Sequence, residues 1–387
     1  MKVLTIHNKY KIRGGEDESR ESEDRLLAAN GHIVREIVFD NSSISGGRVL
    51  GTGIRACWNQ SAYRQVRREI EEWPPDVVDI HNFFPIASPA VHYAARSLSI
   101  PVVQTLHNFR LLCPSATFYR EGRVCEDCAG HLIPWPGVVH RCYHDSAVHS
   151  GAVASMITVH RLLGTWKEKV SLFIAVSKFA KEKFVENGFP EARIFVKPNF
   201  VYDGGEAGPG GEDFLFVGRL APEKGIATLL RAAEMANISG RIKIVGDGPL
   251  QAEVVAAAGR NPRIEYLGRR PQSEVLDLMA RSRCVIFPSE WYETFGRVAA
   301  EAYSRGTPVI AARIGAVAEI VEDGRTGFQY KPGDARELAD AMERACAEPA
   351  LLAAMRLAAR QEYELKYTAE RNYEFMMAAY ERAIANP

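Results

Sequence analysis

Two carboxylates eight positions apart, Glu293 and Glu301, stand in the segment PSEWYETFGRVAAEA, residues 288–302. The alanines around Glu301 are typical of a helix face packed on a sheet, where a charged side chain needs a partner. If the helix begins near Thr294, Glu301 lies roughly 10–12 Å along it, at 1.5 Å per residue. Free backbone N–H groups at a helix start attract anions. The spacing therefore indicates an anion site with an acid on either side, although simple capping or ion pairing is the plainer interpretation.

Glycines and cations at two other strand ends favour the same chemistry. In FVGRLAPEKG, a strand-like run ends at Gly218, and Arg219 and Lys224 follow. In VGDGPL, a second run ends at Gly246 and Gly248. Glycines allow a ligand to approach the backbone, and cations neutralise phosphate. Each fragment alone is equally well explained by solvated charges and ordinary loop glycines, but together they predict a phosphate site.

The three segments together predict a diphosphate site that extends to sugars on either side. Thr294, Phe295 and Gly296 begin the helix and would offer N–H groups to the diphosphate. The distance to Glu301 matches the span from a diphosphate to a ribose. Its carboxylate would accept hydrogen bonds from the ribose hydroxyls. Glu293, at the other end, is placed to hold the hydroxyls of a sugar carried by the diphosphate.

These residues must be positioned by two α/β domains. The chain has 387 residues, which is long for one core and favours two. Strand-like runs alternate with amphipathic stretches, as in βαβ units. The runs are residues 2–8, 33–40, 76–81, 101–107, 172–177, 214–220, 242–248, 264–268, 284–289, 308–312 and 327–330. We expect two doubly wound Rossmann-like domains that face a central cleft.

The domain limits follow from a glycine-rich segment between the two sets of runs. Residues 1–199 form the expected N-terminal, acceptor-side domain, with a cysteine-bearing insertion at about 113–142. Residues 200–213 are a linker, because VYDGGEAGPGGEDF cannot hold a packed element. Residues 214–365 form the nucleotide-sugar-binding domain. Residues 366–387 are expected to form a C-terminal helix that packs back on the first domain.

Composition excludes several classes of protein. With 47% hydrophobic and 25% charged residues, the chain resembles an ordinary globular protein, and it has no apolar run long enough to span a membrane. The start, MKVLTIHNKY, lacks the apolar core of a signal peptide, so a cytoplasmic location is expected. The 48 basic and 48 acidic residues balance and give no reason to expect a nucleic-acid partner.

The sequence resembles the family-4 glycosyltransferases. PSEWYETFGRVAAEA matches the E-x7-E signature of that family, and VGRLAPEKG, VGDGP and GTPVIAARIGAVAEIVEDGRTGF match neighbouring blocks in the same order. The resemblance covers nearly all of the second half. It implies the two-Rossmann-domain (GT-B) fold, a nucleotide sugar bound mainly to the second domain, and transfer with retention of configuration. It also implies that Arg219 and Lys224 bind the diphosphate, Glu293 the donor sugar and Glu301 the ribose.

The first half resembles the family at two places. Gly14 and Gly15, in RGGEDES after the first strand, resemble the glycine loop of the family, which closes over donor phosphate and sugar. His107, in TLHNFRLLCP, stands where family members carry a histidine against the transferred sugar. No two aspartates are spaced D-x-D, so a metal-bound diphosphate is not expected and the cations and helix start must replace it. The resemblance implies that no cofactor takes part in catalysis.

The resemblance leaves the ligands open. The donor would be a UDP- or GDP-sugar, and the acceptor a sugar or lipid-linked sugar in bacterial polysaccharide or glycoconjugate synthesis. A sugar-nucleotide epimerase on the same fold, or a non-catalytic nucleotide-sugar-binding protein, are the alternatives. A nicotinamide-dependent oxidoreductase is disfavoured, because GTGIRA at 51–56 follows no buried strand and GDGPLQ lacks a third small residue.

Four of the seven cysteines lie close together in the sequence. Cys113, Cys125, Cys128 and Cys142 are spaced C-x11-C-x2-C-x13-C. Without a signal peptide, disulfides are disfavoured, and this pattern suits a structural tetrahedral zinc as well as it suits unpaired thiols. Similar cysteine-bearing insertions occur in a bacterial subset of the family whose members resemble surface-polysaccharide assembly enzymes. Because the insertion follows His107, it is expected to border the acceptor site.

Residues 54–73, IRACWNQSAYRQVRREIEEW, combine four arginines with Trp58, Tyr63 and Trp73. Such a helix can rest on an anionic membrane, and that would place the protein at the inner face of the membrane, within reach of a lipid-linked acceptor. Glu69, Glu71 and Glu72 dilute its charge, and they favour an ordinary solvated helix.

Overall fold

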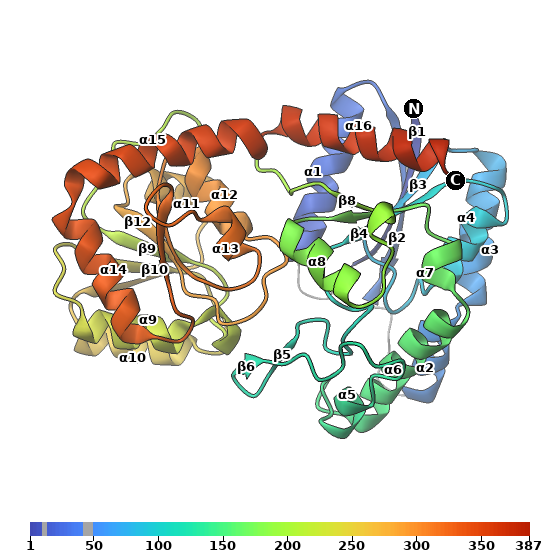
Figure 1. Cartoon of the computed structure of the whole chain (residues 1–387), viewed down its shortest axis with the longest axis horizontal. Coiled ribbons are helices and arrows are strands. Elements are labelled where there is room, and N and C mark those ends of the chain that lie inside the picture. The colour runs from blue at the N-terminus through green and yellow to red at the C-terminus, as the bar shows by residue number, and fades with distance from the viewer. Residues whose placement is uncertain (10–13, 42–48) are drawn as a thin grey trace. The chain divides into compact units, whose positions relative to one another are not determined.

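The computed structural model describes residues 1–9, 14–41 and 49–387, and the chain divides into two compact units (Figure 1). Unit 1 comprises residues Met1–Phe118, Cys125–Pro198 and Tyr373–Pro387. Unit 2 comprises Tyr119–Val124 and Asn199–Asn372. Each unit contains one six-stranded parallel sheet flanked by helices, so the predicted α/β fold class is confirmed.

Unit 1 is built on a sheet in the order β2-β1-β3-β4-β7-β8. Its strands are β1 (Lys2–Lys9), β2 (Ile33–Asp40), β3 (Val77–Ile80), β4 (Val102–Leu106), β7 (Leu172–Ala175) and β8 (Ile194–Val196). The central strands β3, β4 and β7 are buried along their whole length, as expected for strands covered on both faces, whereas edge strand β2 is largely exposed. The strand order reverses between β1 and β3, which is where doubly wound sheets bind ligands.

The sheet of unit 2 has the order β11-β10-β9-β12-β13-β14. Its strands are β9 (Phe214–Val217), β10 (Ile242–Val245), β11 (Ile264–Gly268), β12 (Cys284–Phe287), β13 (Val309–Ala312) and β14 (Gly327–Tyr330). This order is 3-2-1-4-5-6 in chain sequence, the dinucleotide-binding arrangement, and it reverses between β9 and β12. Strands β12 and β13 are wholly buried.

Helices connect the parallel strands of both sheets. In the first part of the chain they are α1 (Gly15–Ala29), α2 (Val49–Cys57), α3 (Gln60–Glu72), α4 (Ala90–Arg96), α5 (Trp135–Val139), α6 (Ala147–Leu162), α7 (Thr165–Glu168), α8 (Lys178–Glu186) and the 3-10 turn η2 (Glu191–Arg193). In the second part they are η3 (Pro222–Lys224), α9 (Ile226–Met235), α10 (Gln251–Arg260), α11 (Gln272–Ala280), α12 (Arg297–Ser304), α13 (Val317–Ile320), α14 (Ala335–Ala347), α15 (Pro349–Lys366) and α16 (Ala369–Ala385).

The last helix connects the C-terminus to unit 1. From Tyr373 onward α16 is part of that unit, and in Figure 1 its red ribbon lies beside the blue strands of the first sheet. The hydroxyl of Tyr380 donates a hydrogen bond of 2.6 Å to Asp79 at β3, and Tyr373 bonds His32 at 2.8 Å. Residues near the end of the chain therefore complete the core of the first sheet.

Two features of the fold have no counterpart in the predicted strands. Short strand β8 was not expected, because its sequence IFV carries little pattern. The insertion after β4 contains a hairpin of β5 (Tyr119–Arg120) and β6 (Arg123–Val124), whose residues 119–124 belong to unit 2 by their contacts. Residues 51–56, the weak dinucleotide motif, lie inside helix α2 and do not form a strand-to-helix turn.

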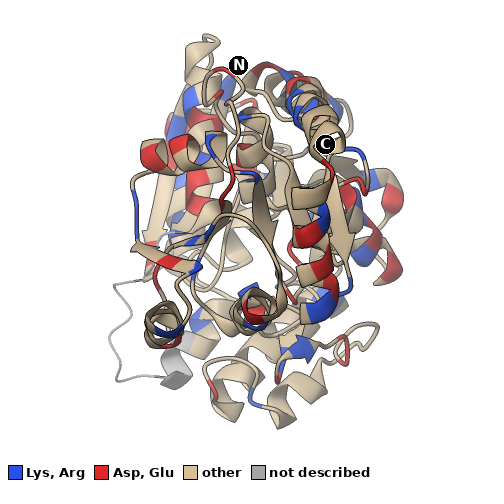
Figure 2. Cartoon of the chain, turned by 90° about the vertical axis from the view of Figure 1, so that its left-hand side faces the viewer, with Lys and Arg blue, Asp and Glu red and all other residues tan. Residues whose placement is uncertain are grey.

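The surface carries both signs of charge along the same helices, as Figure 2 shows. On α3, for example, Arg67 and Arg68 pair with Glu71 and Glu72. Among the described residues, no helix combines the length and apolar character that crossing a membrane would need.

Candidate nucleotide-sugar site

Glycines bring two loops of unit 2 into backbone contact at the carboxyl ends of β9 and β10. Gly246 has a φ of 140°, and a Cβ built there would lie 1.9 Å from the carbonyl oxygen of Gly218. A Cβ at Gly248 would lie 2.6 Å from the oxygen of Leu220. Leu220 N–H donates to the carbonyl of Asp247 at 2.7 Å and so joins the two loops. Gly246 and Gly248 are therefore required by the packing of the loops themselves.

A third glycine fixes the position of Lys224. Lys224 ends the 3-10 turn η3, and Gly225 follows with a φ of 70°. A Cβ at Gly225 would lie 1.8 Å from the oxygen of Pro288, the residue directly after β12. The turn is therefore pressed against the end of the neighbouring strand, at the point where the strand order of the sheet reverses. This places an ammonium group where open α/β sheets bind ligands.

Lys224 and Glu293, predicted separately, form one ion pair. The Nζ atom of Lys224 lies 2.5 Å from Oε1 of Glu293, and the hydroxyl of Ser289 donates to the same oxygen at 2.9 Å. Lys224 also lies 5.1 Å from the centroid of the Trp291 ring. The two charged side chains are 23% and 13% exposed, so the pair is accessible but substantially desolvated. The interaction is correspondingly stronger than that of a fully exposed pair.

The helix that carries Glu301 begins later than expected. Thr294, Phe295 and Gly296 lie before α12, and Gly296 is its N-cap with a φ of 136°. Glu301 is therefore the fifth residue of the helix, and the axial distance from the helix start is shorter than the spacing alone predicted. A left-handed backbone at Gly296 cannot continue a right-handed helix, which explains the difference. Phe295 is buried and contacts Tyr367 edge to face.

Glu301 is almost fully buried and has a charged partner one turn away. Its side chain is 7% exposed, and Nε of Arg297 donates to its Oε1 at 3.0 Å. The plainer interpretation of Glu301, an ion pair within the helix, is therefore correct for one of its contacts. The pair also places a guanidinium in the first turn of α12, next to the predicted anion site. Arg219, by contrast, is exposed on the loop after β9.

In unit 1, Gly14 is the N-cap of α1, and Gly15 is the first helical residue. Residues 10–13, between them and β1, lie outside the described residues. The N–H of Gly14 donates to Asp17 at 2.9 Å, and the other oxygen of Asp17 bonds His7 at 2.8 Å. A Cβ at either glycine would meet no atom within 4 Å, so packing within the described chain does not require them. Their predicted approach to a ligand remains a prediction.

His107 directly follows β4, as predicted, and lines a small pocket with His81, Asn82, Asn108 and Arg110. Its Nε2 atom lies 2.9 Å from Nδ1 of His81. Burial lowers the pKa of His107 well below its usual value, and the positive charges of His81 and Lys197 act in the same direction. His107 is therefore a neutral imidazole at physiological pH.

The four clustered cysteines lie in one insertion and form no disulfide. Burial, together with the nearby Cys113, Cys142 and Cys125, raises the pKa of Cys128 to about 12. Among the described residues, however, the one group with three potential metal-ligand atoms within 4.8 Å of one another is Glu23, Asp79 and His81, and it contains no cysteine. The geometry gives the zinc hypothesis no support, and it stays a prediction that elemental analysis can test.

Several residues of the site were not predicted. Ser289 and Trp291 stand in the quoted signature segment, but only the fold shows that they contact the Lys224–Glu293 pair. The i, i+4 spacing of Arg297 and Glu301 was a visible signal for an ion pair on a helix. His81 ends the run DVVDIH, and nothing in that run indicates its neighbours.

Comparison with known proteins agrees with this arrangement. Residues 25–203 match the family described as Glycosyltransferase Family 4, and residues 206–362 match Glycosyl transferases group 1. The chain belongs to the family-4 glycosyltransferases. The first match covers the first sheet apart from β1, and the second match covers the whole of the second sheet.

Relatives in this family act on different molecules. The chain is 28% identical to glycogen synthase of Mycobacterium tuberculosis over 75% of its own length, and it spans 64% of that protein. It is 28% identical to the 2-deoxystreptamine glucosyltransferase of Streptomyces kanamyceticus, over 87% of this chain and 85% of the relative. Sequence identity at this level indicates the family and leaves the substrate open.

Solved structures share the fold over nearly the whole chain. HepE from Anabaena, solved with UDP, superposes with a TM-score of 0.74 at 20% identity and covers 98% of this chain and 100% of its own. A glycosyltransferase from Rickettsia africae superposes with a TM-score of 0.71 at 17% identity, over 100% of this chain and 99% of its own. The predicted GT-B fold is thereby confirmed.

Proposed function

We propose that this chain is a retaining glycosyltransferase that moves a sugar from a nucleoside-diphosphate donor to a sugar or lipid-linked sugar acceptor. The observation that carries the proposal is the Lys224–Glu293 pair beside the glycine loops, where the strand order of the second sheet reverses. A cation, a carboxylate and accessible backbone at one sheet edge fit a diphosphate that carries a sugar. That HepE was solved with UDP supports this class of ligand.

Donor binding would divide the Lys224–Glu293 pair between two partners. A diphosphate carries more charge than the carboxylate and competes for the ammonium of Lys224. Glu293, still held by Ser289, can then accept hydrogen bonds from hydroxyls of the donor sugar. Glu301, with Arg297 beside it, would bind the ribose. Arg219 is exposed at the same edge and can move toward the phosphates.

Catalysis in this proposal is mainly electrostatic. As the bond from the anomeric carbon to the phosphate oxygen breaks, negative charge grows on the leaving diphosphate, and Lys224 and Arg219 stabilise it. The acceptor oxygen attacks from the same face of the sugar, and the leaving phosphate takes its proton. Such a reaction needs no carboxylate nucleophile and no metal. His107 contacts the transferred sugar as a neutral ring.

The acceptor side belongs to unit 1, and a peripheral contact with an anionic membrane is part of the proposal. Helix α3 is a weak candidate, because its arginines pair with glutamates of the same helix. The insertion offers exposed apolar side chains instead, and these are Leu132, Ile133, Trp135 and Val139, each more than half exposed. Exposed aromatic and aliphatic side chains of this kind bind at membrane interfaces.

The membrane contact has its own test. The protein should sediment with anionic vesicles at low salt and be released as the salt concentration rises beyond about 0.15 M, where the screening length is about 8 Å. A Trp135→Ser variant should sediment less, and Trp58→Ser, which replaces a tryptophan that lies between α2 and α3 and is 38% exposed, provides the comparison. If both variants sediment with the vesicles to the same extent as the unaltered protein, the insertion does not make the membrane contact.

A thermal-shift screen with UDP, GDP and ADP and their sugars tests the donor. A ligand at 100 times its dissociation constant stabilises the native state by about 2.7 kcal/mol. We expect one nucleotide series to raise the melting temperature, with the diphosphate more effective than the monophosphate. If no nucleoside diphosphate shifts the melting temperature, the proposed donor class is wrong.

A further inference from the structure

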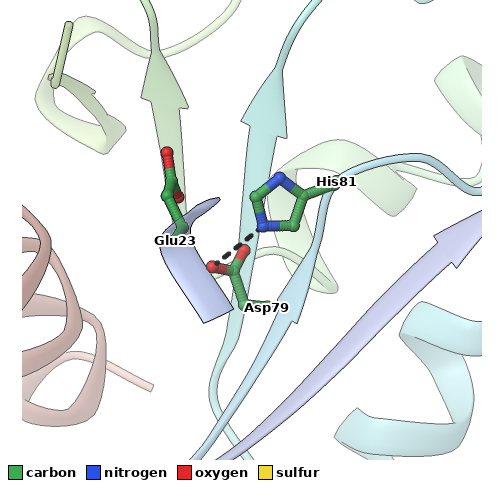
Figure 3. Close-up of side chains that lie close together, drawn as sticks. All are labelled: Glu23, Asp79 and His81. Carbon is green, nitrogen blue, oxygen red and sulfur yellow. Dashed lines mark ion pairs between the residues drawn. The ribbon is translucent and has the colours of Figure 1, made fainter. Parts of the chain in front are cut away.

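A group of buried charged side chains lies at the carboxyl end of the first sheet, beside the point where its strand order reverses. Glu23 on α1, Asp79 on β3 and His81 after β3 are all buried, with potential ligand atoms within 4.8 Å of one another. Figure 3 shows the three side chains, with the ion pair between His81 and Asp79 marked. Lys197, fully buried after β8, and Tyr380 on α16 complete the group.

The group is better explained as a balanced set of protein charges than as a metal centre. Nζ of Lys197 lies 2.5 Å from Oε1 of Glu23, so an ammonium already takes the place that a cation would have. The hydroxyl of Tyr380 donates to Oδ2 of Asp79 at 2.6 Å. Two carboxylates then face one lysine. A second positive charge is needed nearby, because an uncompensated buried carboxylate is costly.

His81 is placed to carry that second charge. Its Nε2 atom lies 3.6 Å from Oδ2 of Asp79, and its ring is 3% exposed. Burial acts to lower the pKa of His81, but the carboxylate of Asp79 outweighs it, and the pKa is raised. Burial acts to raise the pKa of Asp79, but His81 and Tyr380 outweigh it, and the pKa is lowered. The contact with Asp79 and the direction of both shifts favour an imidazolium beside a carboxylate.

The other nitrogen of His81 meets His107. Nδ1 of His81 and Nε2 of His107 are 2.9 Å apart, and the two ring planes are inclined by 19° with centroids 5.2 Å apart. That centroid separation suits a hydrogen bond between ring edges rather than face-to-face contact. An imidazolium has N–H groups at both positions, so His81 donates and Nε2 of His107 accepts. A neutral His107 whose Nε2 accepts must carry its proton on Nδ1.

We propose that Asp79 and His81 are positioning residues for His107, which hold it as the neutral tautomer with its proton on Nδ1. In this state His107 acts toward a sugar as a hydrogen-bond donor, and its Nε2 atom is not available as a base. The sugar-binding role of His107 rests on the proposed function, whereas the tautomer does not. Among the described residues, the charged or titratable groups around His81 are Glu23 and Asp24 on α1, His7 on β1, Asp79 on β3, His107 after β4, Lys197 after β8 and Tyr380 on α16.

Nitrogen-15 NMR of the histidine side chains tests the tautomer in the ligand-free full chain. Among the signals of the ten histidines, those of His81 and His107 can be assigned with His81→Gln and His107→Gln variants. At pH 7.5 we expect both nitrogens of His81 to be protonated and His107 to be protonated on Nδ1 alone. A neutral His81, or a His107 protonated on Nε2, would overturn the proposal. This measurement needs no substrate, so its result is independent of whether transfer activity is found.

The Asp79→Asn variant tests the origin of the charge. Without the carboxylate, His81 should lose its extra proton at pH 7.5, and the share of His107 with its proton on Nδ1 should fall. Tyr380→Phe keeps the carboxylate and removes the hydroxyl that donates to it, so Asp79 should hold the proton of His81 more tightly and the tautomer of His107 should be kept. If Asp79→Asn does not fold, Tyr380→Phe still decides, because an unchanged titration of His81 in this variant would contradict the proposal.

A kinetic comparison separates positioning from general support of the fold. With an identified donor, Asp79→Asn should lower kcat at least about tenfold with little change in donor KM, as when a histidine is left in the wrong tautomer. The matched control is His92→Gln, which replaces a buried histidine of the same unit that bonds Gln104 at 2.9 Å. A loss of kcat in His92→Gln as large as that in Asp79→Asn would show that buried histidines matter only through stability.

Discussion

The two sheets have related topologies, but their carboxyl ends are built in different ways. At the first sheet, charged side chains from α1, the end of β3 and the segment after β8 bury one another, and Glu23, Asp79, His81 and Lys197 are all nearly inaccessible to solvent. At the second sheet, the backbone is brought together by glycines, and the Lys224–Glu293 pair remains partly accessible. The carboxyl end of the first sheet can thus set the protonation of a histidine ring. The carboxyl end of the second sheet leaves room for an anion.

The difference follows from what each end has to stabilise. Phosphate needs N–H groups and cations that are exposed before it arrives, so glycines and short loops suit it. A histidine of fixed protonation needs the opposite, since water would weaken the field that sets its pKa. Changes at the accessible anion site should therefore alter turnover and binding, whereas changes in the closed charge network should alter protonation.

The largest expected effect is on turnover when the accessible cation is removed. Lys224→Ala should lower kcat by about 10²–10³, the cost of one preorganised group that stabilises developing charge. Donor KM should change less, because the charge on the bridging oxygen grows toward the transition state. Steady-state kinetics with the identified donor provide the measurement.

The control for this variant is Lys243→Ala. Lys243 forms an ion pair of 2.7 Å with Asp213, in the same unit and with similar exposure, but it stands near the amino end of β10, whereas the glycine loop follows the carboxyl end. It should leave kcat unchanged. If Lys224→Ala raised KM and kept kcat, Lys224 would be a plain binding group.

A smaller effect is expected on nucleotide affinity when Glu301 is replaced. Loss of hydrogen bonds between the ribose and a charged group should cost about 1.5–3 kcal/mol in binding free energy. Calorimetric titration of the nucleoside diphosphate into Glu301→Gln measures it, and Glu265→Gln, an acid on β11 that pairs with Arg241, serves as the control. Equal affinity of Glu301→Gln and the unaltered protein would leave Glu301 with only its ion pair to Arg297.

The close contact between the two glycine loops can be tested by the free energy of unfolding of glycine variants. Gly246→Ala should lower the free energy of unfolding by about 1–3 kcal/mol or more, because the backbone there is left-handed and the new Cβ meets the oxygen of Gly218. Gly259→Ala is the matched change on helix α10, where a Cβ meets no atom within 4 Å, and it should stabilise by about 0.5–1 kcal/mol. Denaturant titration distinguishes them. Equal and small effects would mean that the two loops are not held together as described.

The smallest expected effect is the pH dependence that the closed network gives to stability. The raised pKa of His81 means that the folded state holds its proton more tightly than the unfolded chain does. The resulting stabilisation is fully present below about pH 6.5, the unfolded value, and it is lost as the pH rises through the folded pKa. The difference in unfolding free energy between the unaltered protein and His81→Gln should therefore shrink as the pH rises. A difference that grows with pH would mean that His81 is neutral.

The sequence predicted the second sheet end better than the first, for a physical reason. Gly218, Lys224, Glu293 and Gly246 stand at the ends of short buried runs, so the βαβ pattern alone brings them to one edge. The βαβ pattern could not predict that Lys224 pairs with Glu293, because this pairing depends on the close contact of Gly225 with Pro288. The helix start was misplaced by the left-handed backbone at Gly296, which the letters do not show.

At the first sheet, His107 was recognised but its supporting residues were not. Asp79 and His81 alternate along a strand end, and their partners Lys197 and Tyr380 are more than 100 positions away in the chain. Charges that neutralise one another across such distances leave no periodic pattern in the sequence. The C-terminal helix was expected to pack on the first domain, but that it donates a hydrogen bond into this network could be seen only in the fold.

The central claim is that this chain transfers a sugar and releases the nucleoside diphosphate, and NMR of the donor during turnover tests it most directly. With the donor identified by thermal shift, the spectra should show free nucleoside diphosphate and a new glycoside of unchanged anomeric configuration, both dependent on an added acceptor. Lys224→Ala should slow the appearance of both products together. A donor whose sugar changes its stereochemistry without any acceptor, with no diphosphate released, would contradict the account and make the protein an epimerase.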